Sequence, residues 1–395
     1  MNEQDSRILA GILTKEGYQE VEDVKDADII VVNSCSVRES AENHILGYIG
    51  NLKHDKEERG AIIALCGCMA QRSGVAEMIF RRSPQVDIVL GTYHLHHLPQ
   101  HIAEVLAGAK HIVDIDGGTE DLPVNLPVKQ DNPFKGQVNI IHGCNNFCTY
   151  CIVPHVRGRE KSRPLSAVLD EVRALAAQGV KEVMLLGQNV NSYGLDGGST
   201  TDFAGLLKEI HKIEGIQRIR FMTSHPKDFS KPLIDTIAQL PKVCRQFHLP
   251  VQSGCDKILS AMHRRYTTAD YWDMLCYIRE TFSDATITTD IMVGFPGETE
   301  ADFIETLAFV ERCQFDVAYT FIYSKRSGTP AAKYPDQVPL AVKKERLDAL
   351  MARQNPISLA LNETLIGKTL PVLVEGISKN NARSEERRVG KECRL

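Results

Sequence analysis

Three cysteines stand close together in the stretch GCNNFCTYC, which runs from Gly143 to Cys151. Cys144, Cys148 and Cys151 follow one another at offsets of four and three residues. A structural zinc site normally takes four protein ligands, commonly as two short pairs, and the next cysteine downstream, Cys244, is far away along the chain. A four-iron cluster on three thiolates would leave one iron open to a substrate or cofactor. The alternatives are a zinc site completed by a distant histidine and a chance spacing of the cysteines.

The composition is that of a globular protein with an unusual number of cysteines. The chain has 395 residues, which is enough for two or three domains, and 43% of them are hydrophobic and 25% charged. The polar start and the lack of a long apolar run resemble neither a signal peptide nor a membrane span, so we expect a cytoplasmic protein. Eleven cysteines in a reducing compartment favour metal or redox use over disulfides. The net charge of −5 excludes a uniformly basic nucleic-acid-binding surface but leaves room for local basic patches.

Residues 1–116 alternate helical and strand patterns, which predicts an N-terminal domain with an open parallel α/β sheet. The expected strands are 28–33, 61–66, 86–91 and 111–115, and the expected helices are 5–16, 38–52, 74–82 and 95–108. Cys35 and Cys68 each follow an expected strand. Ligands in such sheets bind beyond the carboxyl ends of the strands, so both cysteines are candidate ligands.

A second series of strands follows a linker at 117–135, which is rich in proline and acidic residues. Its expected strands are 137–142, 182–186, 218–222, 246–251, 286–293 and 317–323. Six parallel strands are too few for an eight-stranded barrel, so we predict a partial (β/α)6 barrel over 136–366 with its active site at the carboxyl ends of the strands.

The last part of the chain differs from the rest. Another strand-like stretch begins at 367–382, and residues 383–395 read RSEERRVGKECRL. This ending resembles the translation of a sequencing-library adapter, and a native basic tail that contacts RNA is the alternative. We therefore leave 383–395 out of the fold prediction.

The three cysteines of the first paragraph, spaced C-x3-C-x2-C after a strand at the mouth of a partial barrel, resemble the radical S-adenosylmethionine superfamily. The resemblance implies a [4Fe-4S] cluster on Cys144, Cys148 and Cys151, with S-adenosylmethionine bound to the fourth iron. It also implies that one electron from the cluster cleaves this cofactor to give a 5′-deoxyadenosyl radical. Tyr150 stands where that superfamily has an aromatic residue near the adenine, and ordinary packing is the alternative.

Further stretches resemble the methylthiotransferases of this superfamily, over roughly residues 1–380. They are CIVPHVRGREKSRP (151–164), LLGQNVNSYG (185–194), RFMTSHP (220–226), HLPVQSGCDKILSAMHRRYT (248–267), TTDIMVGFPGET (288–299) and YSKRSGTPAA (323–332). GQNVNSYG and HLPVQSG fit the isopentenyladenosine branch, the MiaB type. The resemblance implies transfer of a methylthio group to C2 of N6-isopentenyladenosine at position 37, in the tRNA anticodon loop. The alternatives are another tRNA adenosine or a ribosomal protein as substrate, and a noncatalytic iron–sulfur or zinc-binding module.

The resemblance also implies a second [4Fe-4S] cluster, held by three cysteines of the N-terminal domain. VVNSCSVRESAE places Cys35 on the second of these cysteines and LCGCMAQR places Cys68 on the third. The first normally precedes a stretch like MNEQDS, but no cysteine precedes Cys35 here. Either the sequence begins just after that cysteine, or another ligand replaces it. Cys66 lies on an expected strand, and we interpret it as a buried thiol.

Several other residues are candidates for cofactor or RNA binding. The cofactor-binding candidates are Tyr150, Gln188, Asn189, Gly294, Gly297 and Glu298, although the last three also fit an ordinary strand-to-helix turn. The candidates for contact with RNA phosphates are Arg157, Arg159, Lys161 and Arg163, with His263, Arg264 and Arg265 as a second group. A C-terminal small β-barrel RNA-binding domain (TRAM-like) is expected to begin near Gly367, with most of it missing from this chain.

Overall fold

The computed structural model describes residues 1–35, 39–118, 122–377 and 385–389, which form two compact units. The first unit contains 1–131, 142–145 and 151–163, and the second contains 132–141, 146–150 and 164–395. The break after residue 131 lies inside the predicted linker. In contrast to the sequence-based division, however, 142–145 and 151–163 belong to the first unit, so the cysteine stretch contributes to both.

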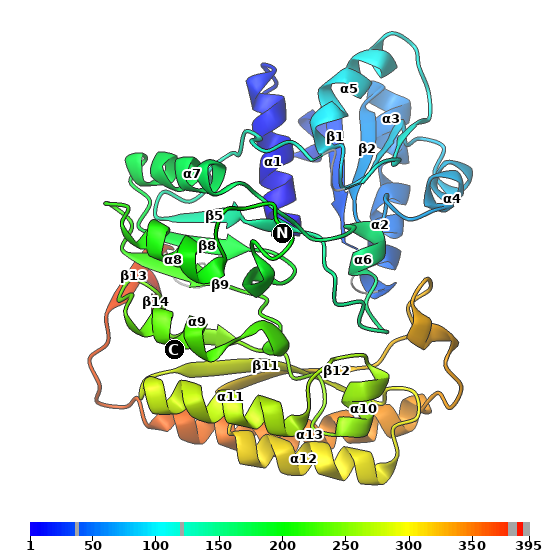
Figure 1. Cartoon of the computed structure of the whole chain (residues 1–395). Coiled ribbons are helices and arrows are strands. Elements are labelled where there is room, and N and C mark those ends of the chain that lie inside the picture. Colours follow the sequence, from blue (N-terminus) through cyan, green and yellow to red (C-terminus); the bar gives the residue numbers. More distant parts are fainter. Residues whose placement is uncertain (36–38, 119–121, 378–384, 390–395) are drawn as a thin grey trace. The chain divides into compact units, whose positions relative to one another are not determined.

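A four-stranded parallel sheet in the order β1-β2-β3-β4 forms the centre of the first unit (Figure 1). Its strands are β1 (Ile29–Ser34), β2 (Ile62–Gly67), β3 (Ile88–Leu90) and β4 (Ile112–Asp114). Its helices are α1 (Asn2–Lys15), α2 (Glu39–Asn51), α3 (Lys53–Arg59), α4 (Val75–Arg82) and α5 (Leu98–Leu106). Short helical turns are η1 (Val24–Asp26) and η2 (Leu95–His97). The predicted open parallel α/β sheet is confirmed.

The middle strands of this sheet are apolar on both faces because helices cover both. Ile63 and Leu65 of β2 pack in one apolar cluster, together with residues of α2 and α4. Ile62 and Cys66 point to the other face and pack with Leu9 of α1 and with α5. The alternation along β2 therefore places Cys66 in the core, where none of its surface is exposed.

The second half of the predicted linker is bound along α1. The backbone N–H of Lys129 donates to the carbonyl of Arg7 (3.0 Å), and the Arg7 guanidinium pairs with Asp131 (3.1 Å). A Cβ atom at Gly11 would lie 2.5 Å from the carbonyl oxygen of Pro127, so only glycine permits this close approach. Residues 122–131 are thus part of the first unit.

Six parallel strands form an incomplete barrel in the second unit, as two sheets in the orders β5-β8-β9 and β10-β11-β12. The strands are β5 (Lys135–Asn139), β8 (Glu182–Leu186), β9 (Arg218–Phe221), β10 (Gln246–His248), β11 (Thr286–Val293) and β12 (Val317–Ile322). A parallel bridge between Ile219 and Val243 joins the two sheets. The predicted partial (β/α)6 barrel is confirmed, with every expected strand present.

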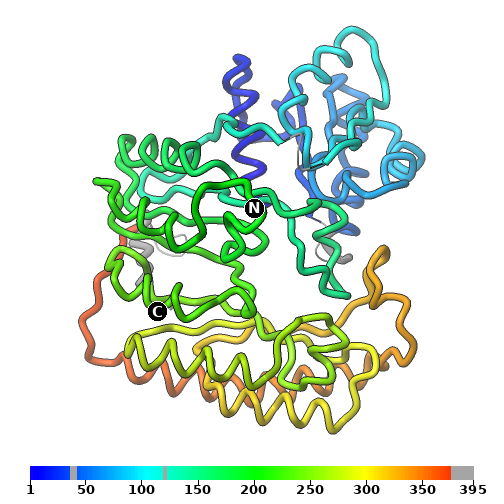
Figure 2. Tube along the Cα trace, viewed as in Figure 1, coloured from blue at the N-terminus to red at the C-terminus, as the bar shows by residue number. Residues whose placement is uncertain are grey.

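Helices follow the barrel strands in turn, as the Cα trace shows (Figure 2). They are α7 (Leu165–Ala177), α8 (Phe203–His211), α9 (Lys231–Ala238), α10 (Asp256–Ala261), α11 (Thr268–Thr281), α12 (Glu300–Cys313) and α13 (Leu340–Glu363). Thr267 and Thr299 close capping boxes with Asp270 and Asp302 at the starts of α11 and α12. Inward side chains of the strands and the apolar stripes of these helices form one large core.

The remaining elements are short or lie near the carboxyl end. The cysteine stretch is followed by α6 (Val153–Val156), and β6 (Ile141–His142) pairs with β7 (Lys161–Ser162). Strand β13 (Val372–Ile377) pairs antiparallel with β14 (Glu385–Val389), so part of the segment excluded from the fold prediction does form a strand. The other residues of 383–395, and residues 378–382 at the expected start of the RNA-binding barrel, lie outside the described residues.

Candidate functional site

The first part of the cysteine stretch is held by the segment 158–160 of the first unit. The backbone N–H of Cys144 donates to the carbonyl of Gly158 (3.1 Å), and the backbone N–H and side-chain amide of Asn145 donate to Glu160 (3.2 and 3.3 Å). Gly143 has φ +73°, and a Cβ atom there would lie 2.0 Å from the carbonyl oxygen of Arg159. Both the conformation and the space at this position therefore require glycine.

The middle of the stretch is held inside the second unit by two loops of the barrel. The backbone N–H of Thr149 donates to the carbonyl of Met262 (3.1 Å), and its own carbonyl accepts from Ala331 (2.9 Å). Phe147 has the left-handed φ of +49°, which is unfavourable for an aromatic residue, and its carbonyl contacts the ring of His263 (3.3 Å). These contacts fix the backbone on both sides of Cys148.

A buried arginine lies against the sulfur of Cys148. Arg264 is 5% exposed and donates to Cys148 Sγ (3.4 Å), to the carbonyl of Pro250 (2.6 Å) and to the hydroxyl of Tyr266 (3.0 Å). The predicted contact of Arg264 with RNA is therefore wrong, because its guanidinium is enclosed by the protein. Arg264 thus places a guanidinium group against the sulfur of a predicted iron ligand.

Tyr150 packs against an apolar cluster that includes Cys255, Met262, Phe295 and Tyr323. This is the ordinary packing that was the alternative to a contact with the cofactor. A contact of Tyr150 with the cofactor stays a prediction.

The two candidate cysteines of the first unit follow neighbouring strands. Ser34 and Gly67, the last residues of β1 and β2, are in register, and the backbone N–H of Cys68 donates to the carbonyl of Ser34 (3.0 Å). Cys66 differs because it is enclosed in the core, where burial raises the pKa of its thiol to about 12. Cys66 lies within β2, whereas Cys68 lies just beyond the carboxyl end of this strand, so its position favours Cys68 over Cys66 as a ligand.

Cys68 also has a buried arginine beside its sulfur. Arg157 Nε donates to Cys68 Sγ (3.2 Å), and its guanidinium forms an ion pair with Asp5. Burial raises the pKa of the Cys68 thiol, and the positive charge of Arg157 opposes that rise. The predicted contact of Arg157 with RNA phosphate is a misassignment, because this side chain is 7% exposed and neutralised by Asp5. Of the same basic run, Arg159 is exposed and Lys161 and Arg163 are partly buried.

The glycine-containing turn after β11 is explained largely by the protein's own packing. Gly294 has φ +71°, and a Cβ atom there would lie 2.3 Å from the side chain of Lys343 on α13. Glu298 is buried and its Oε1 accepts from the backbone N–H of Gly294 (2.8 Å) and from Arg346 (2.7 Å). Gly297, at φ +81°, donates its N–H to the carbonyl of Asp336 (3.0 Å). These contacts match the turn that was the alternative to cofactor binding.

Polar residues gather after β8, at the carboxyl end of the barrel. Asn189 is buried, and its amide donates to Asp228 (2.7 Å) and accepts from the backbone N–H of His225 (3.1 Å). Its hydrogen bonds thus tie two barrel loops together. Gln188, the other predicted residue here, precedes it on the same loop.

Three buried residues of these two loops have side-chain atoms without a hydrogen-bond partner among the residues that the structure describes. They are Asn191 (both amide atoms), Ser224 (Oγ) and His225 (Nε2). Buried polar atoms are nearly always paired, so these atoms at the barrel mouth are candidates for contact with a ligand or water. Sequence reasoning assigned no role to Ser224 and His225, although TSHP follows β9 directly, and that position was the available signal.

A small cavity is lined by side chains of the barrel strands. Its lining residues come from five strands and the position just after β9: Met184, Arg220, Phe221, Met222, Gln246, His248, Thr288 and Tyr319. Arg220 Nε pairs with Glu182 (3.0 Å), and His248 contacts Thr288 Oγ1 (3.0 Å). The interior of the barrel is therefore polar in part.

Comparison with known proteins agrees with this architecture. Residues 138–310 match the radical SAM superfamily, and residues 1–91 match a family described as uncharacterized protein family UPF0004. The tRNA-2-methylthio-N(6)-dimethylallyladenosine synthase of Pelotomaculum thermopropionicum is 53% identical over 378 residues, which cover 95% of this chain and 84% of the relative. The enzyme of the same name from Acetivibrio thermocellus is 49% identical, over 96% of this chain and 80% of the relative.

Solved structures with a similar fold are much more distant in sequence. The radical S-adenosylmethionine methyltransferase TsrM from Kitasatospora setae superposes with a TM-score of 0.64 and 18% identity, covering 84% of this chain and 72% of that one. The cobalamin-dependent S-adenosylmethionine radical enzyme OxsB gives 0.56 and 16%, covering 96% and 60%. At such identities the likeness concerns the fold alone. No helix among the described residues is both long and apolar enough to cross a membrane.

The Gly143→Ala variant should assemble its iron–sulfur centre poorly, because the added methyl group collides with the Arg159 carbonyl and moves Cys144. Iron per chain after anaerobic reconstitution measures the effect, and we expect a several-fold loss. Gly197→Ala is the matched control: its φ of +78° is equally unfavourable for alanine, but a Cβ atom there meets nothing within 4 Å. Equal iron in both variants would contradict the steric argument.

Buried His225 should make the protein less stable in mild acid. Burial, and then the positive charge of Arg264, lower the pKa of His225 to about 2 in the folded state. The unfolded state, with an ordinary pKa of about 6.5, binds more protons between these values, so stability falls as the pH drops below about 6.5, by on the order of 1 kcal/mol per pH unit.

Thermal unfolding at pH 7.0 and 5.5 tests this. The loss of stability between pH 7.0 and 5.5 should be smaller in the His225→Asn variant than in the wild type. In the control variant His54→Asn, which replaces an exposed histidine, the loss should equal that of the wild type. An identical loss in all three proteins would show that His225 does not carry the effect.

Proposed function

Since the chain belongs to the family of tRNA-2-methylthio-N(6)-dimethylallyladenosine synthases, we propose that it adds a methylthio group to C2 of N6-isopentenyladenosine in the anticodon loop of tRNA. The observation that carries this proposal is the C-x3-C-x2-C loop, whose middle is bound to the loops of a partial barrel beside Arg264. Three thiols suit a four-iron cluster that keeps one iron open for S-adenosylmethionine.

The cluster would be held by Cys144, Cys148 and Cys151. When bound, it supplies the electron that cleaves S-adenosylmethionine, and so provides the radical needed to activate an aromatic C–H bond that acid–base chemistry cannot attack. The chain's own part is to keep the cysteine backbone fixed and to place a guanidinium against Cys148 Sγ. A positive charge at this sulfur stabilises a thiolate ligand and orients it.

Cofactor and substrate contacts are assigned to the unpaired polar groups at the barrel mouth. Asn191 and Ser224 offer neutral donors and acceptors, and His225, kept uncharged by burial, offers one ring nitrogen. Gln188 lies on the same loop and is a further candidate for a cofactor contact through its side-chain amide. Asn189, Glu298 and the two glycines of the turn act indirectly, by holding the loops in place.

We assign contacts with the tRNA phosphates to the basic residues of the predicted set other than Arg157, which is buried. Arg159, Lys161 and Arg163 follow the cysteine stretch closely, so phosphate contacts there would bring a single-stranded loop near the cluster. A splayed anticodon-loop base is the form of substrate that a barrel mouth accommodates.

A second cluster is proposed at Cys35 and Cys68. Arg157 lies against Cys68, and the charge of Cys35 acts both on Cys68 and on the amino group of Met1, so the start of α1 lies near both thiols. This group offers two thiolates, and a further ligand is needed to complete a set of three. A cysteine added directly before Met1 would extend the amino end of α1, and its thiol could supply this further ligand.

Replacing Cys148 should abolish cleavage of S-adenosylmethionine. The Cys148→Ala chain loses one of three ligands of the open cluster, so we expect deoxyadenosine release under reducing anaerobic conditions to fall to background. Cys276→Ala, which removes a partly buried cysteine of α11, should release as much as the wild type. Release by Cys148→Ala would refute the ligand assignment, and no release by any chain would favour a noncatalytic iron–sulfur module.

A chain extended by one cysteine before Met1 should bind roughly twice the iron of the same chain extended by serine, about eight against four atoms. It should also convert N6-isopentenyladenosine of tRNA into its 2-methylthio derivative, detected by mass spectrometry of the digested RNA. Equal iron in the two chains would show that the group at Cys35 and Cys68 is not a cluster site. A methylthiolated ribosomal peptide in place of the nucleoside would instead change the assigned substrate.

A further inference from the structure

Histidines are concentrated just after β3, in a segment for which the proposed chemistry has no use. Four of the chain's 13 histidines fall within eight residues, at His94, His96, His97 and His101. Asp114, the last residue of β4, lies beside them. Clusters of histidine in a short tract are typical of metal binding, so the geometry of this group decides its role.

The backbone that carries the group is fixed by the sheet of the first unit. Asp114 is in register with Leu90 on β3, and its carbonyl accepts from the backbone N–H of Gly91 (2.8 Å). The side chain of Gln71 ties the next loops together, because it accepts from the backbone N–H of Thr92 (2.8 Å) and donates to the carbonyl of Ile115 (2.7 Å). The ligand-bearing segments are therefore positioned before any ion binds.

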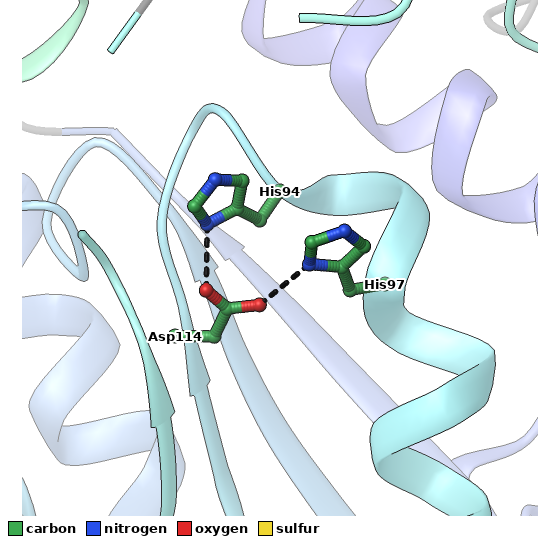
Figure 3. Close-up of side chains that lie close together, drawn as sticks. All are labelled: His94, His97 and Asp114. Atoms are coloured by element: carbon green, nitrogen blue, oxygen red, sulfur yellow. Dashed lines mark hydrogen bonds and ion pairs between the residues drawn. The ribbon is translucent and has the colours of Figure 1, made fainter. Parts of the chain in front are cut away.

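Two imidazoles converge on one carboxylate (Figure 3). His94 Nδ1 lies 2.6 Å from Asp114 Oδ1, and His97 Nδ1 lies 2.8 Å from Oδ2. The two rings stack with their centroids 4.9 Å apart and 21° between their planes, so both present the same nitrogen to the same place. One potential ligand atom from each of the three residues lies within 4.8 Å of the others, and within the described part of the chain no other three residues do so.

A third histidine, His101, forms a hydrogen bond with the same carboxylate. Its Nε2 lies 2.8 Å from Asp114 Oδ2, and its Nδ1 lies 3.1 Å from Glu104. Carboxylates that bind a metal are generally oriented in this way by a hydrogen bond from a neighbouring residue. His101 is a positioning residue in this arrangement and not a ligand.

The donor atoms select the class of ion. Imidazole nitrogen with one carboxylate suits Zn²⁺ and similar divalent transition metals, whereas Mg²⁺ and Ca²⁺ take oxygen ligands. Tetrahedral ligands about 2.0–2.1 Å from zinc stand roughly 3.3 Å apart, so each hydrogen-bonded contact would open by less than about 1 Å. The side chains of His94 and Asp114 are 11% and 18% exposed, and that of His97 is 38% exposed, which leaves a path for entry.

We propose that His94, His97 and Asp114 bind a divalent transition-metal ion of the Zn²⁺ class at the carboxyl edge of the N-terminal sheet. The ion joins the start of α5 to the edge strand β4. Three protein ligands leave its fourth position to water or to a small ligand. This site is separate in sequence and in donor chemistry from the thiolate groups, so it stands or falls independently of the proposed function.

Zinc binding by the full chain, with its iron–sulfur centres reconstituted, tests the site directly. Zinc per chain is measured after dialysis against micromolar Zn²⁺, and zinc K-edge X-ray absorption identifies the ligands, because iron absorbs at a different energy. We expect one bound zinc with nitrogen and oxygen neighbours at about 2.0–2.1 Å, in contrast to the roughly 2.3 Å of zinc bound to cysteine.

Two variants and a control make the result specific. His97→Arg and Asp114→Asn should each bind zinc at least tenfold more weakly. His54→Arg, which removes an exposed histidine of α3, should bind as the wild type does. His97→Arg changes a side chain with considerable exposure, and unchanged iron content and circular dichroism confirm that it folds. Equal zinc affinity in His97→Arg and the wild type, or zinc with sulfur neighbours only, would overturn the proposal and leave a hydrogen-bonded cluster around Asp114.

Discussion

A cysteine can bind iron only as a thiolate, and burial works against that charge. Cys66 shows the effect by itself, because its enclosed thiol has its pKa raised to about 12. Cys68 and Cys148 are also buried, but each has a buried guanidinium against its sulfur, Arg157 in one unit and Arg264 in the other. An arginine stays charged in any protein environment and favours the thiolate beside it, although at Cys68 the charge of Arg157 is shared with Asp5 and burial still leaves the pKa of the thiol raised. The proposed chemistry of both units depends on this pairing of an arginine with a cysteine.

The pairing also explains which predictions failed. Arg157 lies in the basic run of a loop, and Arg264 lies between His263 and Arg265, so both resemble solvent-exposed charges that contact RNA. Their partners are far away in sequence: Asp5 for Arg157, and Pro250 and Cys148 for Arg264. Local patterns report which residues share a helix or strand, but they carry no information on such long-range contacts.

The fold was far more predictable than the site. Strands such as β2, β3 and β8 are apolar runs, because they are covered on two faces, and this pattern can be recognised in the sequence. The helix α3 was missed because it buries no residue and therefore has no apolar period. It is held to the rest of the first unit by polar contacts, because Lys56 pairs with Asp87 (2.7 Å) and Arg59 donates to the carbonyls of Ala27 and Val24. At the barrel mouth the sequence could not separate Asn189, which holds two loops together, from Asn191, whose amide has no hydrogen-bond partner among the described residues.

The central claim is that the three-cysteine loop leaves one iron of a four-iron cluster free to bind S-adenosylmethionine. Mössbauer spectroscopy of a ⁵⁷Fe-reconstituted Cys35→Ala/Cys68→Ala chain tests it most directly, because only the cluster of Cys144, Cys148 and Cys151 then remains. The account predicts that about one iron in four changes its spectrum when S-adenosylmethionine is added, as one iron gains nitrogen and oxygen ligands. Four irons that ignore the cofactor, or a loop that takes up zinc in place of iron, would contradict it.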